Sequence, residues 1–388
     1  MIPLSYNIRS IARRRFSAGA TILGLAMVVA VFALVMMAAT GVKKTLKGTG
    51  SPANAIFLRK GATSELVSAI SRDGAKTFAA DPNVAQEGGK AVASPELYVI
   101  AQVDRVDGSG PANVAFRGFT ADGYNLLRKD TVKVVQGRLP REGTSEVMIG
   151  KAALGRYVGA TLGGSIKKAR REWPVVGVFD ADGSAFDSEI WVDVEQLAQA
   201  FNRTGFYSTM TVKLRSPSDF PALKAVVDAD TRFLAEVKRE DDYYESVSGG
   251  LTAFITILGT IIAIFFSFGA TLGAMITMYA QVASRVREIG TLRALGFRRR
   301  TVLLSFIIES LMLSLAGAVV GCAFASLFGL VKFTMVNFGT FTETRFQLSF
   351  GPNVAIGASL FAIFMGLVGG ILPAIRAARI PIVEATKG

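Results

Sequence analysis

The residue types needed for most enzyme chemistry are scarce in this chain of 388 residues. It has no histidine and a single cysteine, Cys322, which lies inside an apolar run. Disulfides, Cys/His zinc sites and histidine-based catalytic triads are therefore excluded. A serine–lysine pair or paired carboxylates could still act, but no local spacing marks such a pair. We therefore expect neither a catalytic residue nor a metal site on this chain.

One dipeptide, Gly150-Lys151, resembles the end of a phosphate-binding loop. Ser145 stands where the first glycine of GxxxxGK[ST] would be and Ala152 follows the lysine, so the pattern fails twice. The sequence contains no other such pattern. This route to ATP hydrolysis is excluded, and we expect no cofactor on the chain itself.

Charged residues gather in a short segment, residues 285–300, between two apolar runs. As a helix it would carry an apolar stripe of Ile289, Leu292 and Leu295, and Gly296 could end the helix. Such a helix suits docking to a partner protein, and it equally suits lying on a membrane surface. The candidate docking residues are Arg285, Arg287, Glu288, Ile289, Gly290, Leu292, Arg293, Leu295 and Gly296.

An acidic residue, Glu309, lies inside the next apolar run, where an ionised side chain is costly and usually has a partner or a function. The nearby Arg298, Arg299 and Arg300 favour a charge-paired position near the membrane interface. A role in proton or substrate passage is the alternative.

Four apolar runs must position these residues. The chain is 51% hydrophobic, with a mean hydropathy of +0.41, and a helix needs about 20 apolar residues to cross a bilayer. The predicted membrane helices cover residues 17–42, 251–284, 301–331 and 351–375. A cleaved signal peptide or a twin-arginine signal is the alternative for the first run. Its length exceeds the roughly 7–15 residues of a signal core, which favours an uncleaved anchor.

Basic residues set the orientation. Residues 1–16, 285–300 and 376–388 contain four, six and three basic residues, whereas the only basic residues in 332–350 are Lys332 and Arg345. The positive-inside rule places both termini in the cytoplasm and residues 43–250 outside. The net charge of +13 then reflects topology, and we expect no nucleic-acid partner.

Residues 43–250 have the composition of a soluble domain, and their patterns alternate between strand and helix. The predicted strands are 55–58, 97–103, 114–119, 146–149, 173–179, 189–192 and 207–214, and the predicted helices are 64–80, 194–201 and 220–228. The fold class is therefore a membrane α-helical protein of four transmembrane helices, plus an α+β domain inserted between helices 1 and 2.

Small residues recur at four-residue spacing in the membrane helices, as in Gly317 and Gly321 of the third run and Gly366 and Gly370 of the fourth. They allow close helix packing, either within one chain or between two copies. The second run is longer than a bilayer requires. A continuous helix extending toward the domain and a shorter span with an apolar loop are both open.

Several strings resemble one known family. The loop RVREIGTLRALGFRRR (residues 285–300) and the ending PAIRAAR (residues 373–379) with Val383-Glu384-Ala385 resemble permease subunits of MacB/FtsX-type ABC transporters, also called mechanotransmission transporters. Gly137-Arg138, Glu146, Gly150, residues 175–179 and residues 190–192 are similar to the MacB periplasmic core domain. The tail departs from the family at Ile380-Pro381-Ile382, where an acidic residue usually precedes the proline.

The resemblance implies an inner-membrane permease that transmits ATP-driven motion to a periplasmic domain. It implies two permease copies, embedded in membrane lipid, served by two copies of a separate ATPase that binds ATP and Mg²⁺, because only 16 residues precede the first helix. A periplasmic adaptor and an outer-membrane channel would complete an exporter of amphipathic or hydrophobic substrates. A lipoprotein-release or lipid-transfer permease, and a regulator of a cell-wall hydrolase that transports nothing, are the alternatives.

Overall fold

The computed structural model describes residue 9, residues 11–336 and residues 342–380. The chain divides into two compact units. The membrane unit comprises the chain up to Thr40, Ala253–Val331 and the chain from Leu348 onward. The inserted domain comprises Gly41–Thr252 and Lys332–Gln347. The predicted fold class, four membrane helices and a mixed α/β domain between the first and second, is confirmed.

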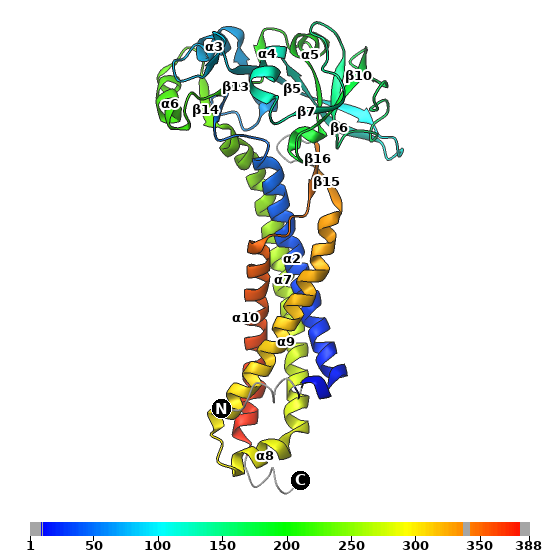
Figure 1. Cartoon of the computed structure of the whole chain (residues 1–388), viewed down its shortest axis with the longest axis vertical. Coiled ribbons are helices and arrows are strands. Elements are labelled where there is room, and N and C mark those ends of the chain that lie inside the picture. The colour runs from blue at the N-terminus through cyan, green and yellow to red at the C-terminus, as the bar shows by residue number, and fades with distance from the viewer. Residues whose placement is uncertain (1–8, 10, 337–341, 381–388) are drawn as a thin grey trace. The chain divides into compact units, whose positions relative to one another are not determined.

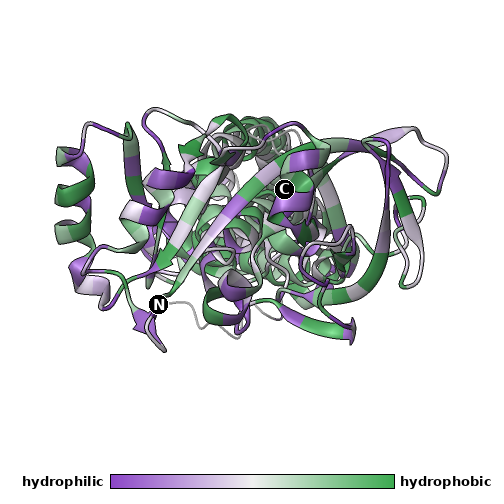
Figure 2. Cartoon of the chain, turned by 90° about the horizontal axis from the view of Figure 1, so that it is seen from above, coloured by the Kyte–Doolittle hydropathy of each residue, from purple (hydrophilic) through white to green (hydrophobic). Residues whose placement is uncertain are grey.

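Among the described residues, four helices are long and apolar enough to cross a membrane, and hydrophobic colouring predominates on the long helices seen end-on in Figure 2. They are α2 (Arg15–Lys47), α7 (Glu240–Ser284), α9 (Arg299–Leu327) and α10 (Pro352–Arg379), labelled in Figure 1. The second apolar run is part of one unbroken helix, because α7 has 45 residues and begins at Glu240. At 1.5 Å per residue it is about 68 Å long. The alternative of a short span with an apolar loop does not occur.

The glycines of α9 and α10 lie against helices of the same chain. A Cβ on Gly321 would stand 2.6 Å from the carbonyl oxygen of Ala26, and one on Gly317 would stand 2.9 Å from Leu25 Cβ, both in α2. Gly366 and Gly370 of α10 likewise face Ser314 and Ser310 of α9. The Ser310 hydroxyl donates to the Gly366 carbonyl at 2.6 Å. These small residues therefore serve packing within one chain.

Gly321→Leu is expected to lower the thermal stability of the detergent-solubilised protein. The new side chain meets the α2 backbone, and overpacking costs about 1–3 kcal/mol or more. The measurement is the temperature at which the monodisperse gel-filtration peak is lost. Gly269→Leu on α7 is the matched control, since a Cβ there meets nothing within 4 Å. Equal losses in the two variants would contradict the packing assignment.

The inserted domain is built on a ten-stranded sheet with the order β14-β1-β13-β5-β6-β11-β8-β10-β7, to which β9 adds by pairing with β10. Its strands are β1 (Asn54–Arg59), β5 (Ala93–Asp104), β6 (Pro111–Phe119), β7 (Lys133–Gly137), β8 (Val147–Gly150), β9 (Ser165–Lys168), β10 (Arg171–Asp180), β11 (Ile190–Asp193), β13 (Thr209–Lys213) and β14 (Ala235–Arg239). Three two-stranded sheets accompany it: β2 (Ile70–Ser71) with β12 (Phe206–Tyr207), β3 (Gln86–Glu87) with β4 (Lys90–Ala91), and β15 (Lys332–Val336) with β16 (Glu343–Gln347).

Two sequence predictions need correction. The helix expected over residues 64–80 is only α3 (Arg72–Ala79), whose N-cap Ser71 accepts a hydrogen bond from the Gly74 amide. The residues before it form a 3₁₀ turn and the short strand β2, and Glu65 in that turn is buried. The loop expected over residues 332–350 contains the β15–β16 hairpin, which belongs to the inserted domain. Helices α5 (Val194–Ala200) and α6 (Phe220–Ala229) lie where helices were predicted.

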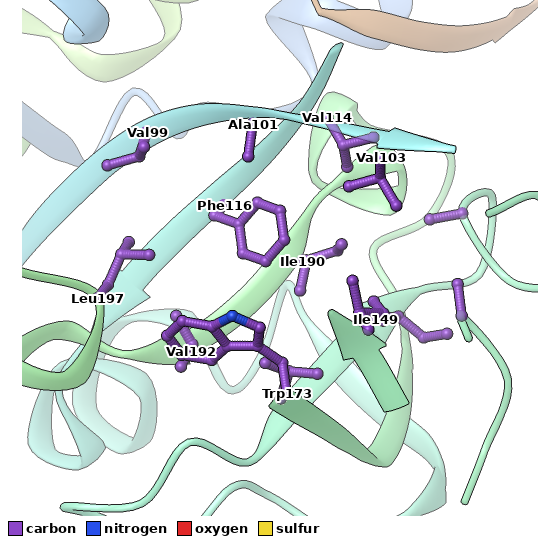
Figure 3. Packing of buried hydrophobic residues seen from close by; sticks show 14 of the residues in the cluster. Val99, Ala101, Val103, Val114, Phe116, Ile149, Trp173, Ile190, Val192 and Leu197 are labelled. Atoms are coloured by element: carbon purple, nitrogen blue, oxygen red, sulfur yellow. The ribbon is translucent and has the colours of Figure 1, made fainter. Parts of the chain in front are cut away.

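Strand alternation divides the core between the two faces of the sheet. In β11, Ile190 and Val192 join one cluster, while Trp191 between them joins another. Figure 3 shows the first cluster, where Phe116 and Trp173 face each other among aliphatic side chains. The second cluster contains Tyr243 and Tyr244, which lie in the first two turns of α7. The start of α7 is therefore part of the core of the inserted domain.

Candidate functional site

The segment between α7 and α9 forms a short helix, α8 (Val286–Ala294). Gly296 follows it with φ of +94°, the left-handed conformation that ends a helix at low cost for glycine. The helix end that the sequence placed at Gly296 is therefore where the structure has it. The tail residues Pro381, Ile382, Val383, Glu384, Ala385 and Lys387 lie outside the described residues.

One side of α8 packs into the membrane unit. Ile289 is 2% exposed and lies in a cluster with Met278 of α7, Phe306 of α9 and Ala374 of α10. Gly290 is also buried. The guanidinium of Arg293 donates to the carbonyls of Ala378 and Ile380 at 3.3 and 3.0 Å. The loop is thus fixed to the neighbouring helices of its own unit.

The other side of α8 is exposed. Leu295 is 72% exposed, Arg287 and Thr291 are exposed, and the Glu288 side chain is 57% exposed. The single docking stripe expected from the sequence is therefore corrected: Ile289 faces inward, Leu292 is half-buried and Leu295 faces outward. The physical reason is the helical period of 3.6 residues, which puts positions 286, 289, 290 and 293 on one face of α8. Apolar residues of α7, α9 and α10 pack against that face at Ile289.

Arg285 occupies the junction between α7 and α8 and is buried. Its Nη1 donates to Glu309 at 3.0 Å, and its Nε donates to Glu288 at 3.0 Å. The guanidinium also lies 5.6 Å from the centre of the Phe306 ring. The cation that pairs with Glu309 is therefore Arg285, whereas Arg298, Arg299 and Arg300, the neighbours suggested by the sequence, are exposed. The geometry agrees with a structural pairing of Glu309.

A second cluster of charges, which the sequence analysis missed, lies buried in the inserted domain. Arg117 of β6 is 1% exposed and pairs with Glu65, Glu96 and Glu189 at 2.7–2.8 Å. The Arg117 guanidinium donates hydrogen bonds to both carboxylate oxygens of Glu65 and to both carboxylate oxygens of Glu189. Such paired contacts are the strong form of a guanidinium–carboxylate interaction.

Arg128 extends this cluster to the long helix. Its guanidinium, 2% exposed at the side chain, pairs with Glu96 at 2.9 Å and with Glu240, the first residue of α7. The other oxygen of Glu240 accepts from the amide of Ser51 and from Asn54 Nδ2 at 3.0 and 2.8 Å. We call Glu65, Glu96, Arg117, Arg128, Glu189 and Glu240 the buried charge network. It holds the N-terminus of α7 in the domain.

The electrostatics of the network are uneven. Burial raises the pKa of Glu96, but Arg128 and Arg117 outweigh it, so that pKa lies below its ordinary value. Burial raises the pKa of Glu189, and Arg117 offsets it only in part. The six residues of the buried charge network come from segments far apart in the sequence, so no local spacing pattern indicates that they pair. The available signals were Arg117 and Glu189, two charges within the predicted strands 114–119 and 189–192.

The residues of the MacB-like strings have structural roles in the sheet. Arg138 binds both oxygens of Glu146 at 2.6 Å, and this bond together with the Arg141 amide lowers the pKa of Glu146 to about 2. A Cβ on Gly137 or Gly150 would stand 2.2 Å from the carbonyl oxygens of Val176 and Asp187. These positions therefore fix loop geometry. Among the described residues, no group of three or more acidic, histidine or cysteine side chains could hold a metal ion.

Two family models cover most of the chain. Residues 252–382 match the FtsX-like permease C-terminal model, and residues 18–230 match the MacB-like periplasmic core domain. The chain belongs to the MacB/FtsX family of ABC transporter permeases. The permease therefore carries both halves of the family architecture in one chain.

Relatives of the permease share about a quarter to a third of its residues. The uncharacterized ABC transporter permease YvrN of Bacillus subtilis is 26% identical, over 94% of this chain and 93% of the relative. The macrolide export ATP-binding/permease protein MacB of Vibrio parahaemolyticus is 26% identical over 53% of this chain and 31% of its own length. The pyoverdine export ATP-binding/permease protein PvdT of Pseudomonas putida is 35% identical over 33% of this chain and 18% of its own length. The chain thus spans less than a third of these two export proteins.

Proposed function

We propose that this permease docks a separate ABC ATPase through the exposed side of α8 and transmits the ATPase motion to the inserted domain. The observation that carries the proposal is the continuity of α7. This helix begins in the buried charge network at Glu240 and ends at Ser284, next to Arg285 and α8. Since an α-helix resists compression and stretching, displacement at one end reaches the other.

The proposed assembly contains two permease copies and two ATPase copies in the inner membrane. ATP and Mg²⁺ bind to the ATPase, and this chain holds no cofactor. Both termini and α8 lie in the cytoplasm and the inserted domain lies in the periplasm, since exposed arginines are dense around α8 and at the start of α9. Each docking contact would include Leu295 together with the exposed charged side chains of Arg287, Glu288 and Arg298.

The proposed activity is export of an amphipathic or hydrophobic substrate through a periplasmic adaptor and an outer-membrane channel. Relatives named for macrolide export and pyoverdine export support this class of substrate. No described feature favours lipoprotein release or hydrolase regulation over export. A cross-linking search for periplasmic partners of the inserted domain tests the adaptor.

Leu295→Asp is expected to abolish ATPase docking. An exposed apolar anchor at the centre of an interface contributes about 2–4 kcal/mol, so ATPase recovery should fall at least about tenfold. The measurement is the amount of ATPase subunit that copurifies with the tagged permease in mild detergent. Val226→Asp, the same kind of change on exposed α6, is the control and should leave recovery unchanged. Undiminished recovery with Leu295→Asp would refute docking through this side of α8.

A further inference from the structure

A cleft of about 620 Å³ lies in the inserted domain between the β15–β16 hairpin and two loops. The loops are the turn after β5, with Arg105 and Asp107, and the segment that contains Arg156. Met335 of β15 and Glu343 and Arg345 of β16 line the hairpin side. We call this site the arginine cleft. The transport mechanism proposed above uses none of these residues.

Positive charge exceeds negative charge in the arginine cleft. Glu343, whose side chain is 9% exposed, accepts from Arg105 on one carboxylate oxygen and from Arg156 on the other, the latter at 3.0 Å. Arg345 lies two residues further along the same strand, so it shares a face of the hairpin with Glu343. With Asp107 included, the lining carries three guanidinium groups and two carboxylates.

Guanidinium donors in the cleft lack acceptors. Arg156 Nη1 and Arg345 Nε are buried atoms with no hydrogen-bond partner among the described residues. A buried donor without an acceptor is costly, and more so when it is charged. Burial and the charge of Arg156 also lower the pKa of Arg345, as expected where two guanidinium groups lie close without sufficient negative charge. The cleft is therefore short of one anionic acceptor.

We propose that the arginine cleft binds an oxyanion, a carboxylate or phosphate group of a soluble molecule or of a lipid headgroup. The planar fork of a guanidinium matches both groups through paired hydrogen bonds. Glu343 holds Arg105 and Arg156 in place, and Arg156 Nη1 and Arg345 Nε are the donors that remain for the ligand. The volume of the cleft admits a small molecule that carries the oxyanion.

The test is isothermal titration of the full chain in nonionic detergent with inorganic phosphate and with acetate, at constant ionic strength. At least one of the two should bind saturably to the unaltered protein. Arg345→Gln should weaken that binding about tenfold or more, because it removes a charged donor. Arg345→Lys should also weaken it, since the charge stays but the fork is lost. The control is Arg215→Gln, because Arg215 is exposed and lies outside the cleft. This variant should bind the anion with the affinity of the unaltered protein.

Tryptophan fluorescence checks folding of the variants, because both tryptophans, Trp173 and Trp191, are buried in the inserted domain. Absence of saturable binding of both anions, or equal affinity in folded Arg345→Gln, would overturn the proposal. The two sources are separated in nanodiscs of phosphatidylcholine with or without phosphatidic acid. Weaker phosphate binding in the presence of phosphatidic acid identifies a lipid headgroup, and unchanged binding identifies a soluble ligand.

Discussion

Arg117→Gln is expected to destabilise the inserted domain by about 3–5 kcal/mol, the usual cost of removing one partner from a buried ion pair. The substitution leaves Glu65 and Glu189 buried without the cation that binds two oxygens of each. Their desolvation is then no longer offset. Few single substitutions in a domain have effects of this size.

Urea unfolding of the full chain, followed by tryptophan fluorescence, measures this effect. Both tryptophans lie in the inserted domain, so the signal reports on that unit alone. Arg215→Gln is the matched control, because the Arg215 side chain is 66% exposed and pairs only at the surface with Asp219. Its effect should stay within about 0.5 kcal/mol. An Arg117→Gln curve that coincides with the control curve would disprove a stabilising role for the network.

Arg285→Gln is expected to loosen the junction of α7 and α8 and, on the proposed function, to reduce ATPase-coupled transport. The substitution removes the cation that lies 3.0 Å from Glu309, which is 1% exposed. A buried carboxylate that loses its paired cation costs about 3–5 kcal/mol. If α8 then shifts against α9, the proposed docking at Leu295 no longer moves α7.

The membrane unit has its own reporter, because the single cysteine of the chain, Cys322, lies in α9. Its reaction with a thiol-specific dye during heating measures unfolding of this unit. Arg287→Gln, on the exposed side of α8, is the control for stability and should leave the midpoint unchanged. The paired replacement Arg285→Met with Glu309→Leu should recover much of the loss, since an apolar pair can replace a buried ion pair. A midpoint for Arg285→Gln equal to that of Arg287→Gln would contradict the pairing.

The membrane architecture could be predicted because its causes are local. Each span is a continuous apolar run, and hydrocarbon imposes a helix on such a run because every backbone group must bond within it. The four-residue spacing of glycines in α9 and α10 also predicts close packing of these helices. It could not tell one chain from two, because the partner of Gly321 is residue Ala26 in α2, which only the packed helices identify.

Sequence patterns could not predict which charged residues form ion pairs with each other. Glu309 was expected beside the arginines that follow α8, but the loop folds back and brings Arg285 to it. The spacing of apolar residues in 64–80 predicts a helix through Glu65. In the structure Glu65 forms an ion pair with Arg117, 52 residues away in the sequence. This tertiary contact overrides the local preference of the segment for a helix.

By itself, the sequence determined four membrane helices, an inserted α+β domain, the absence of histidine chemistry and the end of α8 at Gly296. Each depends on the composition or spacing of neighbouring residues. The tertiary structure alone decided which side of α8 is free, that α7 runs unbroken from a buried charge network, and that three arginines meet in one cleft. Those features join segments distant in the chain, and their energies come from burial and pairing, which exist only in the folded protein.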